Sequence, residues 1–176
     1  MQSRAPSNPG WGTLRETGES SAVTPSQNCI DLVQQFEGCA QKQPDGSFKA
    51  YPDPGTGKLP WTIGWGSTGA DIVENTVWSQ AQCDARLEAN LTSFSAQVSA
   101  LLGSAPTNQN QFDALVDFAY NIGVANLESS TLLRLHKAGD YAGAAAQFPL
   151  WDHADGKVLP GLQKRRAAEQ ALYEKA

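Results

Sequence analysis

The sequence predicts an α+β fold, in which a small β-hairpin lobe is joined by a long helix to a mainly helical lobe. Three observations lead to this prediction. Apolar residues recur at helical spacing ahead of residue 38, a turn-rich aromatic stretch follows over about 43–69, and helical spacing resumes over about 79–176. Because strands and helices do not alternate along the chain, a βαβ architecture is not expected, and a cleft is expected between the two lobes.

The first predicted helix begins after Ser26, whose side chain can cap it, and ends near Gly38. Val33 and Phe36 lie on its apolar face. Glu37 is therefore expected at the end of a helix, next to the β-rich lobe.

The β-rich lobe is predicted from turn signals that separate short extended pieces. Turns are indicated at Pro44-Asp45-Gly46 and at Pro52-Asp53-Pro54-Gly55. The extended pieces carry large apolar side chains, namely Phe48, Tyr51, Trp61, Ile63 and Trp65.

The helical lobe is predicted from a series of helix starts. Ser79, with Gln82 three residues on, forms a possible capping box for a long helix that continues through Leu101. This helix is long enough to connect the two lobes. Further helices are expected to begin at Thr107, Ser130, Asp140 and Pro160.

The N-terminal segment differs in composition from the rest of the chain. Residues 1–25 are rich in Pro, Ser and Gly and contain no apolar signal-peptide core. They are expected to form a flexible tail or linker, ahead of a single folded domain over 26–176.

Composition argues against several classes of protein. The 13 basic and 18 acidic residues give a net charge of −5, which disfavours sequence-independent binding to nucleic acid and to anionic membranes. No apolar run approaches the roughly 20 residues of a membrane helix, so no stable membrane insertion is expected. The potential metal ligands are Cys29, Cys39, Cys83, His136 and His153. Their spacing in the sequence matches no common metal site, so neither a metal nor a cofactor is expected.

Glu37 and Asp53 are the best candidates for acid–base chemistry. Cleavage of a glycosidic bond needs an acid that protonates the leaving oxygen and usually a second carboxylate. A helix end beside Phe36 can desolvate Glu37, whereas a Pro-bracketed turn keeps Asp53 ionised. The hydroxyl of Thr62 could help to fix a water molecule. On the residues alone, a glutamate at a helix end such as Glu37 is more often a solvated acid, and an aspartate between prolines such as Asp53 is more often a turn former.

Several motifs, taken in order, resemble the phage-type lysozymes, the endolysins of glycoside hydrolase family 24. The resemblance extends from about Pro25 to the C-terminus, which makes it more specific than any single motif. The motifs that carry it are Gln35-Phe36-Glu37-Gly38-Cys39, Ala50-Tyr51-Pro52-Asp53-Pro54, Trp61-Thr62-Ile63-Gly64-Trp65-Gly66-Ser67-Thr68-Gly69, the segment 112–123, Ser130-Thr131-Leu132-Leu133, Lys157-Val158-Leu159-Pro160-Gly161-Leu162 and Arg165-Arg166-Ala167-Ala168-Glu169.

The resemblance implies a lysozyme-like catalytic domain that hydrolyses the β-1,4 bond between N-acetylmuramic acid and N-acetylglucosamine in peptidoglycan, by inversion. Glu37 would be the acid, Asp53 would position or activate water, and Thr62 would assist. Asn121 and Trp151 are candidates for substrate binding; the alternatives are a helix-end polar residue and a core aromatic residue. The resemblance also implies a monomer that is made in the host cytoplasm, reaches the periplasm and cell wall through a holin-type pore, and lyses the host.

Two departures from the family pattern affect this interpretation. The interval between Glu37 and Asp53 is about twice the usual one, and the extra length around 41–49 is interpreted as a longer hairpin. Asp45 fits the shorter spacing but lies in a turn signal without the following Trp-Thr-Ile-Gly strand, so Asp53 is preferred. Ser67 stands where many members carry a His, so any ion pair made by that His is absent.

Three questions stay open at this level. Cys39 and Cys83 could form a disulfide if the long helix packs beside the first one. The alternative is that all three cysteines are buried thiols. A lytic transglycosylase would use Glu37 without a water-activating partner, and an inactive peptidoglycan-binding module would bind without cleavage. Retention of Glu37, Asp53 and Thr62 together favours a hydrolase.

Overall fold

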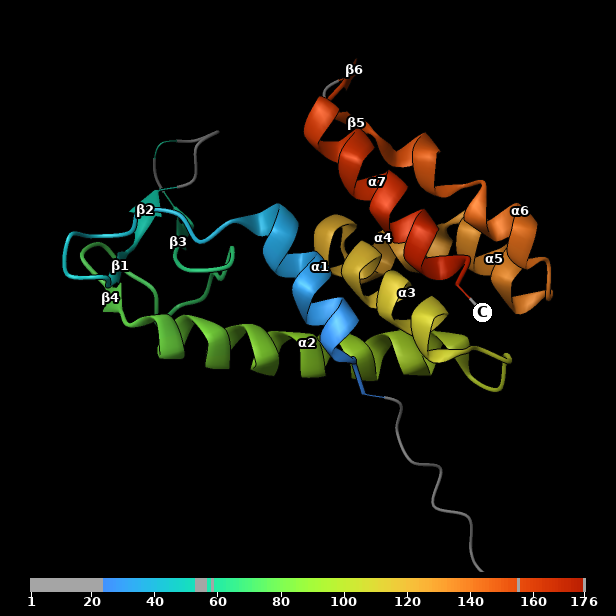
Figure 1. Ribbon diagram of the computed structural model, residues 1–176, viewed down its shortest axis with the longest axis horizontal. Coiled ribbons are helices and arrows are strands. Elements are labelled where there is room, and N and C mark those ends of the chain that lie inside the picture. The colour runs from blue at the N-terminus through green and yellow to red at the C-terminus, as the bar shows by residue number, and fades with distance from the viewer. Residues whose placement is uncertain (1–23, 53–56, 58, 155, 176) are drawn as a thin grey trace, which may run out of the picture.

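The computed structural model describes residues 24–52, 57, 59–154 and 156–175. Within these residues there are seven α-helices, one 3₁₀ helix and three two-stranded antiparallel sheets, which confirms the predicted α+β fold. Figure 1 shows the strands β1 to β4 at one end of the molecule, the helices α3 to α7 at the other, and α2 running along both. The tail predicted over 1–25 lies almost wholly outside the described residues.

Helix α1 (Gln27–Glu37) is anchored to helix α3 (Gln109–Ile122) at its beginning. Ser26 caps α1 as predicted, and its backbone N–H donates to Asp113 Oδ1 of α3 at 2.9 Å. Its hydroxyl bonds to the same carboxylate. Because the start of α1 is fixed in this way, Glu37 at its other end is held where the helical lobe meets the β lobe (Figure 1).

The β lobe is built from two short strand pairs. They are β1 (Phe48–Lys49) with β4 (Val77–Trp78), and β2 (Tyr51–Pro52) with β3 (Trp61–Thr62). The first pair extends this lobe past the predicted limit near residue 69. The extension was not predicted, because a strand of two residues shows no periodicity in a sequence. The β lobe has a small core of its own, which includes Phe48, Ile63 and, from helix α2, Cys83.

The extra length around 41–49 does form a hairpin. The N–H of Gln43 donates to the carbonyl of Ser47 at 2.7 Å. Asp45 accepts from the N–H and the hydroxyl of Ser47, at 2.9 and 2.6 Å, and these bonds lower the pKa of Asp45. Asp45 is thus an exposed turn residue whose carboxylate is bound by the turn itself.

Helix α2 (Gln80–Leu102) connects the lobes as predicted. Its capping box of Ser79 and Gln82 is present. The 23 residues of α2 span about 35 Å at a rise of about 1.5 Å per residue. Cys83 near its start packs into the β-lobe core, whereas Leu91 further along packs into the main core, so one helix supports both lobes.

Helix α3 is the centre of the helical lobe. Every residue from Gln111 to Ala119 is buried, and α3 packs against α1, α2 and α7. The surrounding elements are α4 (Val124–Ser129), α5 (Thr131–Lys137), α6 (Tyr141–Ala145), the 3₁₀ helix η1 (Phe148–Trp151), the hairpin of β5 (His153–Ala154) and β6 (Lys157–Val158), and α7 (Pro160–Tyr173).

The predicted start of α3 at Thr107 is wrong by one residue. Asn108 is the N-cap and forms a capping box with Gln111. The hydroxyl of Thr107 instead bonds to the carbonyl of Ala105 and to His136 Nε2, at 3.0 and 2.8 Å. Tertiary contacts with α5 therefore outweigh the capping preference of Thr107. The starts predicted at Ser130, Asp140 and Pro160 are confirmed.

The cysteines answer part of the question left by the sequence. Cys39, two residues beyond α1, packs against the β-lobe core beside Cys83, and the two thiols are within hydrogen-bonding contact. Both are free thiols here, as is Cys29. No helix in the described part of the chain is long and apolar enough to cross a membrane.

Candidate active site

Glu37 lies in a cleft at the junction of the two lobes. One pocket beside it has a volume of about 390 Å³ and lies between the β lobe and helices α2 and α3. A second, of about 500 Å³, lies toward the start of α7. The first is lined by Glu37, Gly66, Thr68, Asn90, Phe94, Tyr120 and Asn121, and the second by Phe36, Glu37, Asn121, Leu159, Pro160, Gly161, Leu162 and Arg165.

The carboxylate of Glu37 is held from two sides. Arg165 NH1 donates to Glu37 Oε1 at 2.6 Å, and the side chain of Glu37 keeps 21% of its surface exposed. On the other side Gly66, with φ of +78°, comes so close that a Cβ atom there would lie 2.9 Å from Oε2. A residue larger than glycine at position 66 would therefore displace the carboxylate.

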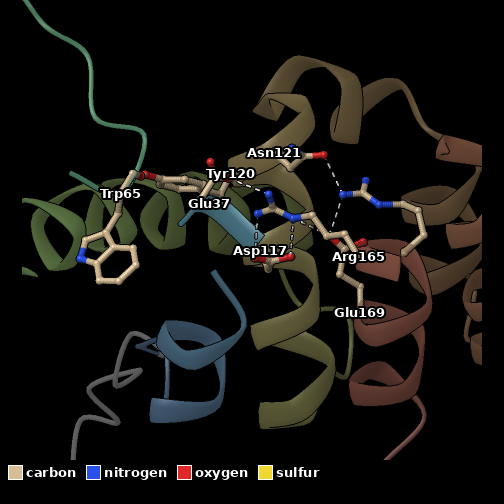
Figure 2. Close-up of polar contacts among 8 residues, drawn as sticks. Glu37, Trp65, Asp117, Tyr120, Asn121, Arg165 and Glu169 are labelled. Carbon is tan, nitrogen blue, oxygen red and sulfur yellow. Dashed lines mark hydrogen bonds and ion pairs between the residues drawn. The ribbon is translucent and has the colours of Figure 1, made fainter. Parts of the chain in front are cut away.

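Arg165 is itself fixed by a buried carboxylate. Asp117 of α3 is fully buried and accepts two hydrogen bonds from Arg165, one from Nη2 at 2.9 Å and one from Nε at 3.2 Å. Burial alone lowers the pKa of Arg165, but Asp117 and Glu37 outweigh it and raise that pKa. Arg165 is therefore a permanent cation that joins α7 to α3 and to the end of α1 (Figure 2).

A second buried arginine reaches the other side of the cleft. Arg166 NH2 donates to Asn121 Oδ1 at 2.7 Å and to Glu169 Oε1 at 2.8 Å. Asn121, which was predicted to bind substrate, thus lines both pockets while its amide oxygen is bound by the protein. Asn121 is thus a structural acceptor at the end of α3 that also lines the cleft, and its role in substrate binding stays a prediction.

The remaining predicted residues lie at different distances from this cleft. Thr62 is half-buried on β3 opposite Tyr51, and it is not among the residues that line the two pockets around Glu37. Burial, and then the charge of Glu37, raise the pKa of Tyr51, so this strand pair is electrostatically coupled to Glu37. Asp53, which directly follows β2, lies outside the described residues.

Trp151 packs with the main core. Its ring meets Phe118 edge-on at 5.5 Å between centroids, and it does not line either pocket that contains Glu37. Of the two interpretations of Trp151, this placement favours a core aromatic residue. A role in substrate binding stays a prediction.

Ser67, which replaces the family His, closes a tight turn. It exchanges backbone hydrogen bonds of 3.0 Å with Ile63, and its hydroxyl accepts from Asn90 Nδ2 at 3.3 Å. Ser67 is almost fully buried. An uncharged side chain therefore fills this position without leaving a buried charge.

Sequence reasoning assigned no role to Arg165, Asp117 or Tyr120. Tyr120 donates its hydroxyl to the carbonyl of Trp65 at 2.9 Å, which fixes the β-lobe loop that carries Gly66 (Figure 2). Burial and the charge of Glu37 raise the pKa of Tyr120 to about 12. The signal available was a pair of arginines on the helix face that also carries Leu172 and Tyr173, which indicates buried anionic partners.

Comparison with known proteins is consistent with this geometry. Residues 34–169 match the family model described as phage lysozyme. The chain is 43% identical to an endolysin of Acyrthosiphon pisum secondary endosymbiont phage 1, a match that covers 86% of this chain and 98% of that protein. It is 41% identical to an endolysin of Bacillus phage PZA, over 84% of this chain and 54% of that protein, so it spans about half the length of that relative.

Solved structures show the same fold. The muramidase domain of SpmX from Asticaccaulis excentricus superposes with a TM-score of 0.74 at 32% identity, over 86% of this chain and 97% of that one. A lysozyme of phage P22 superposes with a TM-score of 0.72 at 29% identity, over 86% of this chain and 99% of that one.

Proposed function

Because the chain belongs to the phage lysozyme family, we propose that it is a muramidase that hydrolyses the β-1,4 bond between N-acetylmuramic acid and N-acetylglucosamine in bacterial peptidoglycan. The observation that carries the proposal is the place of Glu37, a half-buried carboxyl in a cleft between two lobes. Glycosidic cleavage needs a carboxyl group in such a setting to protonate the leaving oxygen.

In this proposal Glu37 is the general acid and Asp53 activates the attacking water. Two features support the second role. The alternative carboxylate, Asp45, is already bound by Ser47 in its own turn. Asp53 directly follows β2, whose Tyr51 pairs with Thr62 of β3, and in this proposal the Thr62 hydroxyl helps to orient the same water. A water between acid and base corresponds to cleavage with inversion.

The cleft offers suitable groups for a sugar chain. Arg166 occupies the amide oxygen of Asn121, which leaves the amide N–H groups for a substrate carbonyl or hydroxyl. The ring centroids of Phe94 and Tyr120 lie 5.2 Å apart, and the two rings supply an apolar wall beside Glu37. Polar donors beside aromatic faces are typical of sites that bind small polar ligands.

The biological role is proposed from the relatives. Proteins named endolysin match over most of this chain, so lysis of a bacterial host at the cell wall is the role we propose. Peptidoglycan is the proposed partner, reached from the host cytoplasm through a holin-type pore, and the active form is proposed to be a monomer.

The test is release of reducing ends from purified peptidoglycan by the wild type, Glu37→Gln and Asp53→Asn. Glu128→Gln, the same change at an exposed residue of α4, is the matched control. We expect the first two variants to lose at least about 10²-fold in rate, with circular dichroism spectra equal to the wild type, while Glu128→Gln keeps full activity.

Other outcomes would point elsewhere. Anhydro sugar ends in place of reducing ends would identify a lytic transglycosylase. Binding to peptidoglycan without release of either product would identify an inactive binding module, and either result would refute the muramidase proposal.

A further inference from the structure

Three carboxylates and two guanidinium groups meet behind the catalytic cleft (Figure 2). Arg165 bonds to Glu37, Asp117 and Glu169, and Arg166 bonds to Glu169. Apart from Glu37, all of these residues are buried. With every group ionised, the cluster would hold one more negative than positive charge where water has little access.

Asp117 and Glu169 converge on the same nitrogen atom. Arg165 Nε lies 3.2 Å from Asp117 Oδ2 and 3.4 Å from Glu169 Oε1, and the two carboxyl groups are within hydrogen-bonding contact of each other. Two ionised carboxylates in such contact repel strongly when buried, so one proton has to lie between them.

The hydrogen bonds indicate which residue carries the proton. Both oxygens of Asp117 accept from Arg165, as expected for a carboxylate. Glu169 Oε1 accepts from Arg166 NH2 at 2.8 Å, but its Oε2 is buried and has no donor in the described structure. Burial and then Asp117 raise the pKa of Glu169 well above its usual value.

We propose that Glu169 is protonated at neutral pH, that Oε2 donates this proton to Asp117, and that Glu169 thereby acts as a positioning residue for Glu37. As a neutral donor, Glu169 leaves the charge of Asp117 available to hold Arg165. If Glu169 ionised, it would repel Asp117 and compete with Asp117 and Glu37 for Arg165. The protonation state rests on the contacts of Asp117 and Glu169, whereas its catalytic consequence rests on the proposed function.

The elements packed around Glu169 contribute charged and titratable groups of both signs. Helix α3 contributes Asp117, and α7 itself contributes Arg165 and Arg166. Helix α1 contributes Glu37 through Arg165, and the buried thiol of Cys29, whose pKa is raised by burial and then by Asp117. The 3₁₀ helix η1 has no titratable side chain. Among the described residues, Asp117 and Glu169 therefore have no neighbouring cation beyond the two arginines.

The proton itself is observable by infrared spectroscopy. The difference spectrum between wild type and Glu169→Gln at pH about 7 is expected to contain the carbonyl stretch of a protonated carboxylic acid, shifted in D₂O. The same difference against Glu128→Gln, an exposed residue, is expected to lack it. Absence of the band from the Glu169 difference spectrum would overturn the proposal. This measurement needs no enzymatic activity, so it is independent of the muramidase assignment.

The positioning role is tested by comparing Glu169→Gln with Glu169→Ala. Glutamine keeps the volume and an N–H donor toward Asp117, so kcat is expected to stay within about threefold of the wild type, while alanine lowers kcat at least about tenfold with little change in KM. Equal losses in both variants would overturn the role.

A stability measurement keeps the test decisive if Glu169→Ala does not fold. Because the folded state binds the proton of Glu169 more tightly than the unfolded state, this proton should stabilise the wild type fully below the unfolded-state pKa of about 4.3, and stability should fall as the pH rises from there to the raised folded-state pKa. Glu169→Gln should lack this part of the decline in the urea midpoint. A decline of equal size in both proteins would refute the shared proton.

Discussion

The change Gly66→Ala tests whether close backbone contact sets the position of Glu37, the proposed catalytic acid. The added Cβ would lie 2.9 Å from Glu37 Oε2, whereas ordinary contact begins at 3.4 Å, so the carboxylate has to retreat by about 0.5 Å. A misplacement of about 1 Å can lower a rate about 10²-fold, so half that distance predicts a loss of roughly tenfold in kcat/KM, or about 1.4 kcal/mol.

The same change has a separate effect on stability. Position 66 has φ of +78°, and an L-residue in that region is disfavoured by about 1–2 kcal/mol. Gly46→Ala is the matched control, because Gly46 has φ of +86° but nothing within 4 Å of its added Cβ. Both variants should therefore lose similar stability in urea, whereas only Gly66→Ala should release reducing ends more slowly. If the two variants keep equal activity, contact with Gly66 does not position Glu37.

Three further predictions follow from buried polar groups. Arg165→Met leaves Asp117 without its cation and should lower the free energy of unfolding by about 3–5 kcal/mol, measured by urea denaturation; a loss below about 1 kcal/mol would contradict the buried network. Burial lowers the pKa of His136. Near pH about 6.5 the unfolded state therefore binds a proton at this residue more readily than the folded state, so the free energy of unfolding should fall as the pH drops below that value. His136→Gln should flatten this acid limb, and an unchanged limb would show that other groups cause it. Oxidised glutathione should remove two hydrogens from Cys39 and Cys83, reducing itself to two thiols, and the new disulfide should stabilise the fold by about 4 kcal/mol for a loop of about 45 residues; Cys83→Ser should gain neither the mass change nor the stability.

Features encoded by neighbouring residues could be predicted from the sequence. The caps Ser26 and Ser79 depend on contacts within one helical turn, and both were found where expected. The start of α3 was missed because Thr107 and Asn108 both have capping side chains, and only the fold shows that Thr107 is engaged by His136. Local sequence therefore determines that a helix begins, and tertiary contacts select the residue.

The site was predicted less completely because its parts are far apart in the chain. Glu37 and Arg165 are separated by 128 positions, and no periodicity relates them. Trp151 illustrates the opposite difficulty: an aromatic residue suits a sugar cleft and a core equally well, and only its packing against Phe118 distinguishes them. Motif order pointed to Glu37 as the candidate acid, but the groups that hold its carboxylate could be identified only from the structure.

The charge of the buried cluster also bears on how Glu37 would act as an acid. With Glu169 neutral, two arginines face the single carboxylate of Asp117, so the surroundings of Glu37 carry a net positive charge. In the proposed reaction, that charge would stabilise the carboxylate that remains after Glu37 has given its proton to the leaving oxygen, through groups already in place before reaction. With Glu169 ionised, the surroundings would be neutral and this stabilisation would be smaller. The proton on Glu169 would then affect the charge around Glu37 as well as the position of its carboxylate.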